Sequence, residues 1–244
     1  MKSRQQGDGF MKIYAINGGP RKKWNTAKML EQFLEGAKSA DKRVETELIH
    51  LFDYSFAGCI SCYNCKRDDD ARYGRCNIKD EISEVIKQVS YADGVIFGSP
   101  IYFYNMTGQL RCFLERLIFP YHSFKKGEGS LAPKQVQTAL VYTMNVTEAR
   151  MRMSGYDRNL AGIERTIGET FSSTPEILYA FNTYEFDDYK KHRADYWNEP
   201  EKAEWHRTQF PVDLKNAFEA GKRMVEKIQA CLLNLDRFKQ PSKQ

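Results

Sequence analysis

The sequence predicts an α/β fold with a doubly wound, five-stranded parallel sheet and helices on both faces. Two observations lead to this fold class: short apolar stretches alternate along the chain with amphipathic stretches of helical period, and the connections between them are short. Right-handed crossovers between parallel strands place helices on both faces of such a sheet. A ligand crevice is then expected at the carboxyl ends of the strands, where the winding reverses.

The first half of the chain supplies three strands and three helices of this pattern. Residues 11–17 form a short apolar run that ends at Gly-Gly-Pro, which is typical of a buried strand. Apolar residues such as Leu30 and Phe33 then recur at helical spacing, after Asn25 or Thr26 as a natural N-cap. The expected strands are 11–17, 44–51 and 94–100, and the expected helices are 25–40, 80–91 and about 107–117.

The second half continues the alternation. Strands are expected at 137–144 and 175–182, with helices near 158–170 and 211–233. Five strands and about five helices match the flavodoxin-like architecture, in which the strands, numbered along the chain, lie in the order 2-1-3-4-5.

The length of 244 residues suits one decorated α/β domain. We expect a disordered polar leader at 1–10 and a single domain at 11–244, which carries a cysteine-rich loop at 57–78 and an irregular extension at 184–210. The extension, which contains several aromatic residues, is expected to cover a ligand, form a subunit interface or pack on its own subunit.

Composition narrows the classes of partner. The 37 basic residues are interleaved with 32 acidic ones, so we expect no nucleic-acid partner despite the net charge of +5. The longest apolar runs are too short to span a bilayer, which argues against a membrane partner. Six cysteines without an export signal favour reduced thiols or metal ligation, and therefore a cytoplasmic location.

The loop after the first strand has the layout of a phosphate site. It reads NGGPRKKWNT over residues 17–26, and a helix begins where it ends. Glycines allow a sharp turn that presents backbone N–H groups, the helix N-terminus is partially positive, and basic side chains neutralise an anion. The spacing fits neither dinucleotide nor triphosphate loops, so a mononucleotide fits better, while an ordinary solvated turn is the alternative. The candidate residues are Gly19, Arg21, Lys23, Asn25 and Thr26.

The segment at 98–116, GSPIYFYNMTGQLRCFLER, leaves the central strand, turns at Pro100 and enters a helix capped by Asn105 or Thr107. Its consecutive residues Tyr102, Phe103 and Tyr104 suit the mouth of a crevice for a flat aromatic ligand. The alternative is that these rings belong to the core or to an interface.

Four cysteines follow the second strand with the spacing C-x2-C-x2-C-x10-C. Three thiols so close together can hold one face of an iron-sulfur cube, whereas structural zinc sites more often use two separated pairs. Iron-sulfur is the sharper hypothesis, with zinc and free thiols as alternatives. The candidate ligands are Cys59, Cys62, Cys65 and Cys76.

Both loops resemble motifs of the NADPH-dependent FMN reductases and iron-sulfur flavoproteins. The segment at 17–26 is similar to the family's GSPRxxxNT loop, with Gly19 in place of serine and Trp24 in place of a small residue. The segment at 98–116 resembles the motif GSPxYxxxxxxxLKxFxDR, and the likeness extends over roughly residues 11–185. The cysteines resemble the family's compact motif, lengthened by the insertion KRDDDARYGR.

The resemblance implies an FMN-dependent oxidoreductase that passes electrons from NAD(P)H to a quinone, flavin or other small-molecule acceptor. It implies that the flavin performs the redox step, so no catalytic side chain is assigned. A 4Fe-4S cluster, if bound, makes ferredoxin a plausible electron donor, and the family's homodimers or homotetramers are expected. The ring would contact Pro100, Ile101, Tyr102, Phe103, Asn105, Thr143, Met144 and Asn145.

Two other classes of function stay open. One is a flavin and iron-sulfur electron carrier without a substrate of its own. The other is a zinc-stapled interaction module that has lost its flavin.

Overall fold

The computed structural model describes residues 10–239, with the backbone alone for 234–239. The leader expected at 1–10 lies outside the described residues, apart from Phe10. The strands are β1 Met11–Asn17, β2 Val44–His50, β3 Gly94–Tyr102, β4 Asn105–Met106, β5 Gln137–Thr143 and β6 Glu176–Ala180. The α-helices are α1 Asn25–Ala40, α2 Ser83–Ser90, α3 Gly108–Ile118, α4 Glu148–Met153, α5 Tyr156–Phe171, α6 Glu199–Thr208 and α7 Phe210–Lys239. Short 3-10 turns are η1 Leu51–Asp53, η2 Asn64–Lys66, η3 Phe119–Tyr121 and η4 Tyr189–Lys191.

The sheet confirms the predicted fold class. Its path runs β2-β1-β3-β5-β6, and every pairing along this path is parallel. Numbered without the two-residue strand β4, this is the expected order 2-1-3-4-5. The chain winds outward in both directions from β1 and β3, and the crevice at their carboxyl ends is where a ligand is expected in an open α/β sheet.

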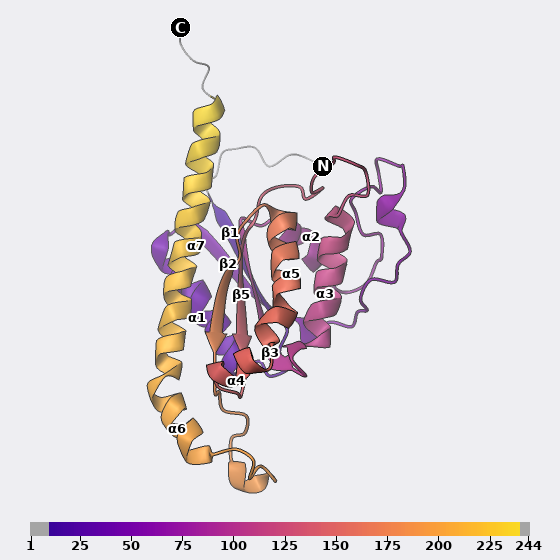
Figure 1. The fold of residues 1–244 in the computed structure, drawn as a ribbon. Coiled ribbons are helices and arrows are strands. Elements are labelled where there is room, and N and C mark those ends of the chain that lie inside the picture. Colours follow the sequence, from indigo (N-terminus) through magenta and orange to yellow (C-terminus); the bar gives the residue numbers. More distant parts are fainter. Residues whose placement is uncertain (1–9, 240–244) are drawn as a thin grey trace.

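Helices cover both faces of the sheet (Figure 1). One apolar core lies between the sheet and α1 with α7, and it includes Phe33 of α1 and Met224 of α7. The other core lies between the sheet and α2, α3 and α5, and it includes Phe113 and Phe171. The central strands β1, β3 and β5 are buried on both faces, so they read in the sequence as nearly continuous apolar runs. The start of the edge strand β2 instead alternates between buried or half-buried residues and exposed ones.

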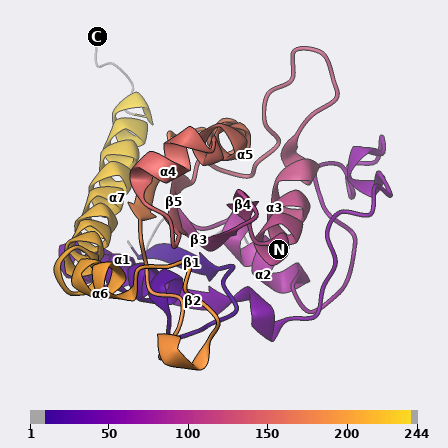
Figure 2. The same cartoon turned by 60° about the horizontal axis from the view of Figure 1, so that its bottom comes forward.

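Three elements were not expected from the sequence pattern. The strand β4 pairs antiparallel with the end of β3, and α4 precedes α5. The helix α6 lies in the segment 184–210, for which an irregular extension was expected, and Figure 2 brings this end of the molecule forward. No helix within residues 10–239 has the length and apolar character needed to cross a membrane.

The helices α1 and α7 cross at unusually close range. A Cβ atom on Gly36 would lie 1.8 Å from the carbonyl oxygen of Phe218, and one on Gly221 would lie 2.0 Å from the carbonyl oxygen of Phe33. Neither space can be opened by a side-chain rotation, since the obstructing atoms belong to the backbone. The crossing therefore depends on the two glycines, and it fixes α7 against the helix that follows the 17–26 loop.

We expect Gly221→Ala to lower the free energy of unfolding by about 3 kcal/mol, because the methyl group forces the two backbones apart. Gly162 of α5 has no atom near its ideal Cβ position. Gly162→Ala should therefore raise the free energy of unfolding by about 0.5–1 kcal/mol, since alanine favours the helix. Urea unfolding followed by circular dichroism measures both values. Equal effects at the two positions would contradict the close crossing.

Candidate functional site

A pocket lies at the carboxyl ends of β1, β3, β5 and β6, where the fold predicts a ligand. Its cavity has a volume of about 70 Å³. The lining residues come from the β1–α1 loop, the end of β3, the end of β5 and the segment after β6. They are Gly19, Pro20, Arg21, Trp24, Asn25, Thr26, Pro100, Ile101, Tyr102, Thr143, Met144, Asn145, Thr183, Tyr184 and Glu185.

Two loops of this pocket are fastened to each other through Gly18. Its N–H donates to the carbonyl oxygen of Gly98 at 2.8 Å, and its carbonyl accepts from the hydroxyl of Thr107 at 2.7 Å. The same Thr107 hydroxyl caps α3 by accepting from the Leu110 N–H. Thr107 is therefore the cap of this helix, of the two candidates that the sequence offered. A Cβ on the neighbouring Gly19 would lie 3.1 Å from Cδ of Pro100, which leaves little room for the family's usual serine.

The N-terminus of α1 opens into the pocket without a side-chain cap. The capping position is occupied by Trp24, which makes no side-chain capping bond, and not by Asn25 or Thr26 as expected. The first N–H groups of a helix have no partner within it, and together with the helix dipole they attract an anion. Asn25 and Thr26 are buried here, and the Thr26 hydroxyl lies 2.7 Å from that of Thr143.

The segment at 183–185, here called the closing segment, occupies side-chain donors of the β1–α1 loop. The Tyr184 carbonyl accepts from Trp24 Nε1 at 3.1 Å and from Asn25 Nδ2 at 2.8 Å. The Glu185 carbonyl accepts from Arg21 at 2.6 Å. These backbone oxygens thus occupy donors for which a bound anion would compete.

A buried lysine from α6 supports the closing segment. Lys202 is 2% exposed, and its ammonium donates to the Asn145 carbonyl at 2.6 Å and to the Asn182 side chain at 2.9 Å. Burial lowers the pKa of Lys202. Asn145 in turn donates to the Glu185 carboxylate at 2.8 Å. The helix α6 therefore positions both the end of β5 and the closing segment.

The turn between β3 and β4 holds bulky residues in a costly conformation. Phe103 and Tyr104 are the two central residues of the hairpin, and both have positive φ, at 47° and 70°. Glycine or asparagine normally occupies such positions, and a bulky residue there costs on the order of 1–3 kcal/mol. Tyr104 packs edge-on against Tyr156, whereas Phe103 is 97% exposed. Phe103 is thus presented to solvent at the side of the pocket.

The structure brings most of the predicted cofactor-binding residues together in this pocket. The predicted residues that line it are Gly19, Arg21, Asn25, Thr26, Pro100, Ile101, Tyr102, Thr143, Met144 and Asn145. Lys23, Phe103 and Asn105 are not among the lining residues, and all three are exposed. Thr183, Tyr184 and Glu185 also line the pocket and were not among the predicted site residues. Two of them, Tyr184 and Glu185, belong to the extension at 184–210, for which covering a ligand was one of the expected roles.

The four candidate cysteine ligands line a second, smaller pocket beside α3 and η3. The inserted residues form a turn whose end returns to the cluster, because the Gly74 N–H donates to the Cys65 carbonyl at 3.0 Å. Gly74 has a φ of +71°, a conformation that glycine adopts without strain. The insertion therefore leaves Cys76 in the same pocket as Cys59, Cys62 and Cys65.

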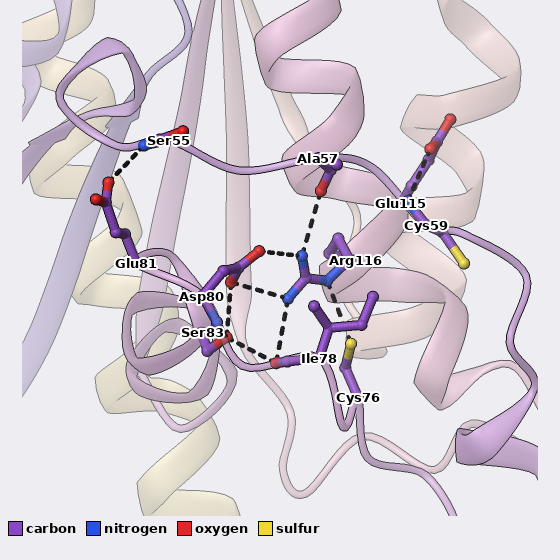
Figure 3. Close-up of polar contacts among 10 residues, drawn as sticks. All are labelled: Ser55, Ala57, Cys59, Cys76, Ile78, Asp80, Glu81, Ser83, Glu115 and Arg116. Carbon is purple, nitrogen blue, oxygen red and sulfur yellow. Dashed lines mark hydrogen bonds and ion pairs between the residues drawn. The ribbon is translucent and has the colours of Figure 1, made fainter.

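Two basic side chains fasten the cysteine loop. Lys66 donates to the carbonyls of Phe119 and Pro120 at 2.6 and 3.1 Å, and burial lowers its pKa. Arg116 of α3 is 1% exposed and contacts both Cys76 and Asp80 (Figure 3). Its hydrogen bonds hold the pKa of the Asp80 carboxyl below the usual range.

The donor set of this second pocket fits a cluster by its chemistry. Among residues 10–233, whose side chains the structure describes, no three histidine, cysteine or acidic side chains converge to hold one metal ion. Each iron of a 4Fe-4S cluster takes its own cysteine, so four thiols around one pocket suit that group. The cavity is only about 20 Å³, so the loop with Cys59 and the exposed Cys62 would have to move outward.

Comparisons with known proteins agree with the fold and the two pockets described above. The family model described as NADPH-dependent FMN reductase matches residues 11–149. An iron-sulfur flavoprotein of Methanocaldococcus jannaschii is 37% identical over 106 residues, which are 43% of this chain and 51% of that protein. One from Archaeoglobus fulgidus is 38% identical over 106 residues, 43% of this chain and 48% of that protein. The chain spans about half the length of the curated relatives it matches.

Solved structures share the fold. An NAD(P)H:quinone oxidoreductase from Methanothermobacter marburgensis aligns with a TM-score of 0.65 at 16% identity, over 87% of this chain and 98% of that one. An FMN-dependent NADH-azoreductase from Bacillus anthracis, solved with FMN, gives 0.58 at 15% identity, over 88% and 99%.

The sheet order and the crevice at its carboxyl edge define a flavodoxin-like protein. Since the family model covers more than half of its length, the chain belongs to the NADPH-dependent FMN reductase family. The resemblance recognised in the two loops is thereby confirmed.

The strained hairpin yields a test that needs no ligand. We expect Phe103→Asn to raise the free energy of unfolding by about 1 kcal/mol, because asparagine tolerates positive φ and the exposed ring contributes little burial. Tyr91→Asn is the matched control, since Tyr91 is also exposed but has a φ of −107°. Thermal and urea unfolding measure both. A destabilised Phe103→Asn protein would contradict the strain.

Proposed function

We propose that this chain is an FMN-dependent oxidoreductase that passes electrons from NAD(P)H, or from ferredoxin, to a quinone, flavin or other small acceptor. The observation that carries the proposal is the common pocket formed by the β1–α1 loop, the end of β3 and the end of β5. Family membership supports FMN as the group held there. When bound, the flavin supplies the redox chemistry, and the protein binds and orients it.

The phosphate of FMN would be held at the uncapped N-terminus of α1. The backbone N–H groups of the first turn would donate to the anion, and Arg21 and Asn25 would add side-chain donors within the same pocket. Lys23 is exposed and would act only as a nearby charge. This assignment gives a role to the basic residues that the loop carries.

The flavin ring would lie against Pro100, Ile101 and Tyr102, beside Thr143, Met144 and Asn145. Phe103 and Asn105 stand just outside the lining and would meet the ring, an acceptor or a second subunit. A drug-sized ligand needs a pocket of roughly 300–1,000 Å³, so binding requires the closing segment to withdraw from the present cavity. Its carbonyls would give up Arg21 and Asn25 to the phosphate.

The remaining parts of the proposal concern the cysteines and the assembly. Cys59, Cys62, Cys65 and Cys76 would hold a 4Fe-4S cluster, and the similarity to proteins named iron-sulfur flavoproteins supports this group. All six cysteines are free, which suits a reducing compartment such as the cytoplasm. A homodimer or homotetramer would cover exposed rings such as Phe103.

The activity has a direct test. Purified protein loaded with FMN should oxidise NADPH or NADH in steady state with a quinone or free flavin as the acceptor, and its visible spectrum should show bound flavin. Single electron transfer without steady-state turnover would favour the electron carrier instead. A colourless protein that does not bind added FMN would refute the proposal.

If the closing segment competes with FMN for the donors of the β1–α1 loop, two substitutions in this loop should change the affinity for FMN in opposite directions. Trp24→Phe keeps a ring beside Arg21 but removes the indole donor to Tyr184, so the segment withdraws more easily and the Kd should fall about fivefold. Arg21→Met removes a phosphate donor, so the Kd should rise at least about tenfold. Fluorescence quenching of FMN measures both. A weaker affinity in Trp24→Phe would show that the segment does not compete with the ligand.

A further inference from the structure

Arg116 contacts both ends of the cysteine loop. Its guanidinium donates to the carbonyl of Ala57, just before Cys59, at 3.2 Å. It also donates to Asp80, just after the loop, at 2.8 Å. One buried side chain thus closes the loop at its base, as Figure 3 shows.

The same guanidinium makes a third kind of contact, which loop closure does not require. Arg116 Nε lies 3.2 Å from Cys76 Sγ and donates to it. Cys76 is the ligand that follows the insertion and is the farthest in sequence from the other three cysteines. A donor aimed at its sulfur both fixes the side chain and stabilises negative charge on that atom.

The other charged side chains around the cysteine loop make contacts different from those of Arg116. The carboxylate of Asp80 faces it, and Ser83 shares that carboxylate at 2.7 Å. Glu115 points to the other end of the loop, where its carboxylate accepts from the Cys59 N–H at 3.3 Å. Lys66 donates its hydrogen bonds to the backbone carbonyls of Phe119, Pro120 and His122. Arg116 is therefore the basic side chain that this network brings into contact with a candidate ligand sulfur.

We propose that Arg116 is a positioning residue for the cysteine site, which fixes Cys76 as the fourth ligand and raises the reduction potential of a bound iron-sulfur cluster. The inference rests on the proposed cluster and goes beyond it, because it assigns a role to a residue that is not a ligand. Hydrogen bonds to ligand sulfur stabilise the reduced, more negative state, so their loss lowers the potential.

The test uses the full chain loaded with FMN and reconstituted anaerobically with iron and sulfide. Arg116→Lys keeps the charge but loses the planar fork that reaches Asp80 and Cys76 together. Redox titration followed by electron paramagnetic resonance should show the one-electron reduction equilibrium shifted about tenfold toward the oxidised state, or about 59 mV. Iron, sulfide and FMN content are measured on the same samples.

Lys66→Arg is the comparison for a purely structural role, since it keeps the positive charge beside the loop, disturbs the bonds of Lys66 to the carbonyls of Phe119 and Pro120, and removes no sulfur donor. It should lower iron content while the remaining cluster keeps its potential. Arg165→Lys makes the same substitution at an exposed position on α5, and it should leave both the iron content and the potential unchanged. If Arg116→Lys lowers iron content with no shift in potential, the proposed tuning is wrong, and a wild-type chain that takes up no iron overturns the proposal altogether.

A second substitution covers the case in which Arg116→Lys does not fold. Asp80→Asn keeps the Arg116 donor and removes the carboxylate that competes for it, so the equilibrium should move toward the reduced state. No movement, or movement toward the oxidised state, overturns the proposal. FMN content distinguishes a failure of the Arg116 proposal from a failure of the proposed function. A variant that retains its flavin but shows no shift in potential contradicts only the role of Arg116.

Discussion

The pocket and the position of the cysteine loop both depend on the contact between Gly18 and the start of α3. Gly18 donates to Gly98 and accepts from Thr107, so the β1–α1 loop and the β3–α3 connection form one rigid edge. A Cβ on residue 18 would lie 2.6 Å from Cβ of Leu110, so a side chain at this position would separate the two loops. The pocket exists because two segments about ninety residues apart are held at this distance.

The same contact determines where the cysteine site lies. Thr107 caps α3 at the pocket, and Arg116 lies near the other end of that helix. Nine residues at about 1.5 Å each separate them along the helix axis, or about 14 Å. A helix that is fixed at its start carries its later residues to defined positions. The helix α3 therefore begins beside the pocket at the carboxyl ends of the strands and ends beside the cysteine loop. Changes at Arg116 leave the Thr107 contact untouched, since effects at distant sites without shared partners are largely independent.

Most elements of this fold were predictable because burial of one face gives their sequence a regular spacing of apolar residues, whereas the missed elements β4, α4 and α6 are too short or too polar to show such a spacing. The helix at Asn25–Ala40 was predicted with its observed bounds, while α6 is polar and follows no clear period. The two pocket loops were predictable because glycine, proline and aromatic residues mark sharp turns. The contacts of Arg116 were not, because a buried arginine inside an amphipathic helix shows its partners only once distant segments are placed.

The closing segment supplies hydrogen-bond acceptors to the donors of the β1–α1 loop, which would otherwise lack partners within the pocket. Asn25 is buried, whereas Arg21 is exposed and keeps its access to water. An unsatisfied buried polar group such as the Asn25 amide costs about 1–3 kcal/mol. The carbonyls of Tyr184 and Glu185 satisfy these donors when no anion is present. A phosphate dianion is a stronger acceptor than a neutral carbonyl, so in the proposed function it would displace them, and the apparent affinity would fall only by the cost of withdrawal. The free energy of binding would then be the difference between two sets of hydrogen bonds to the same side chains.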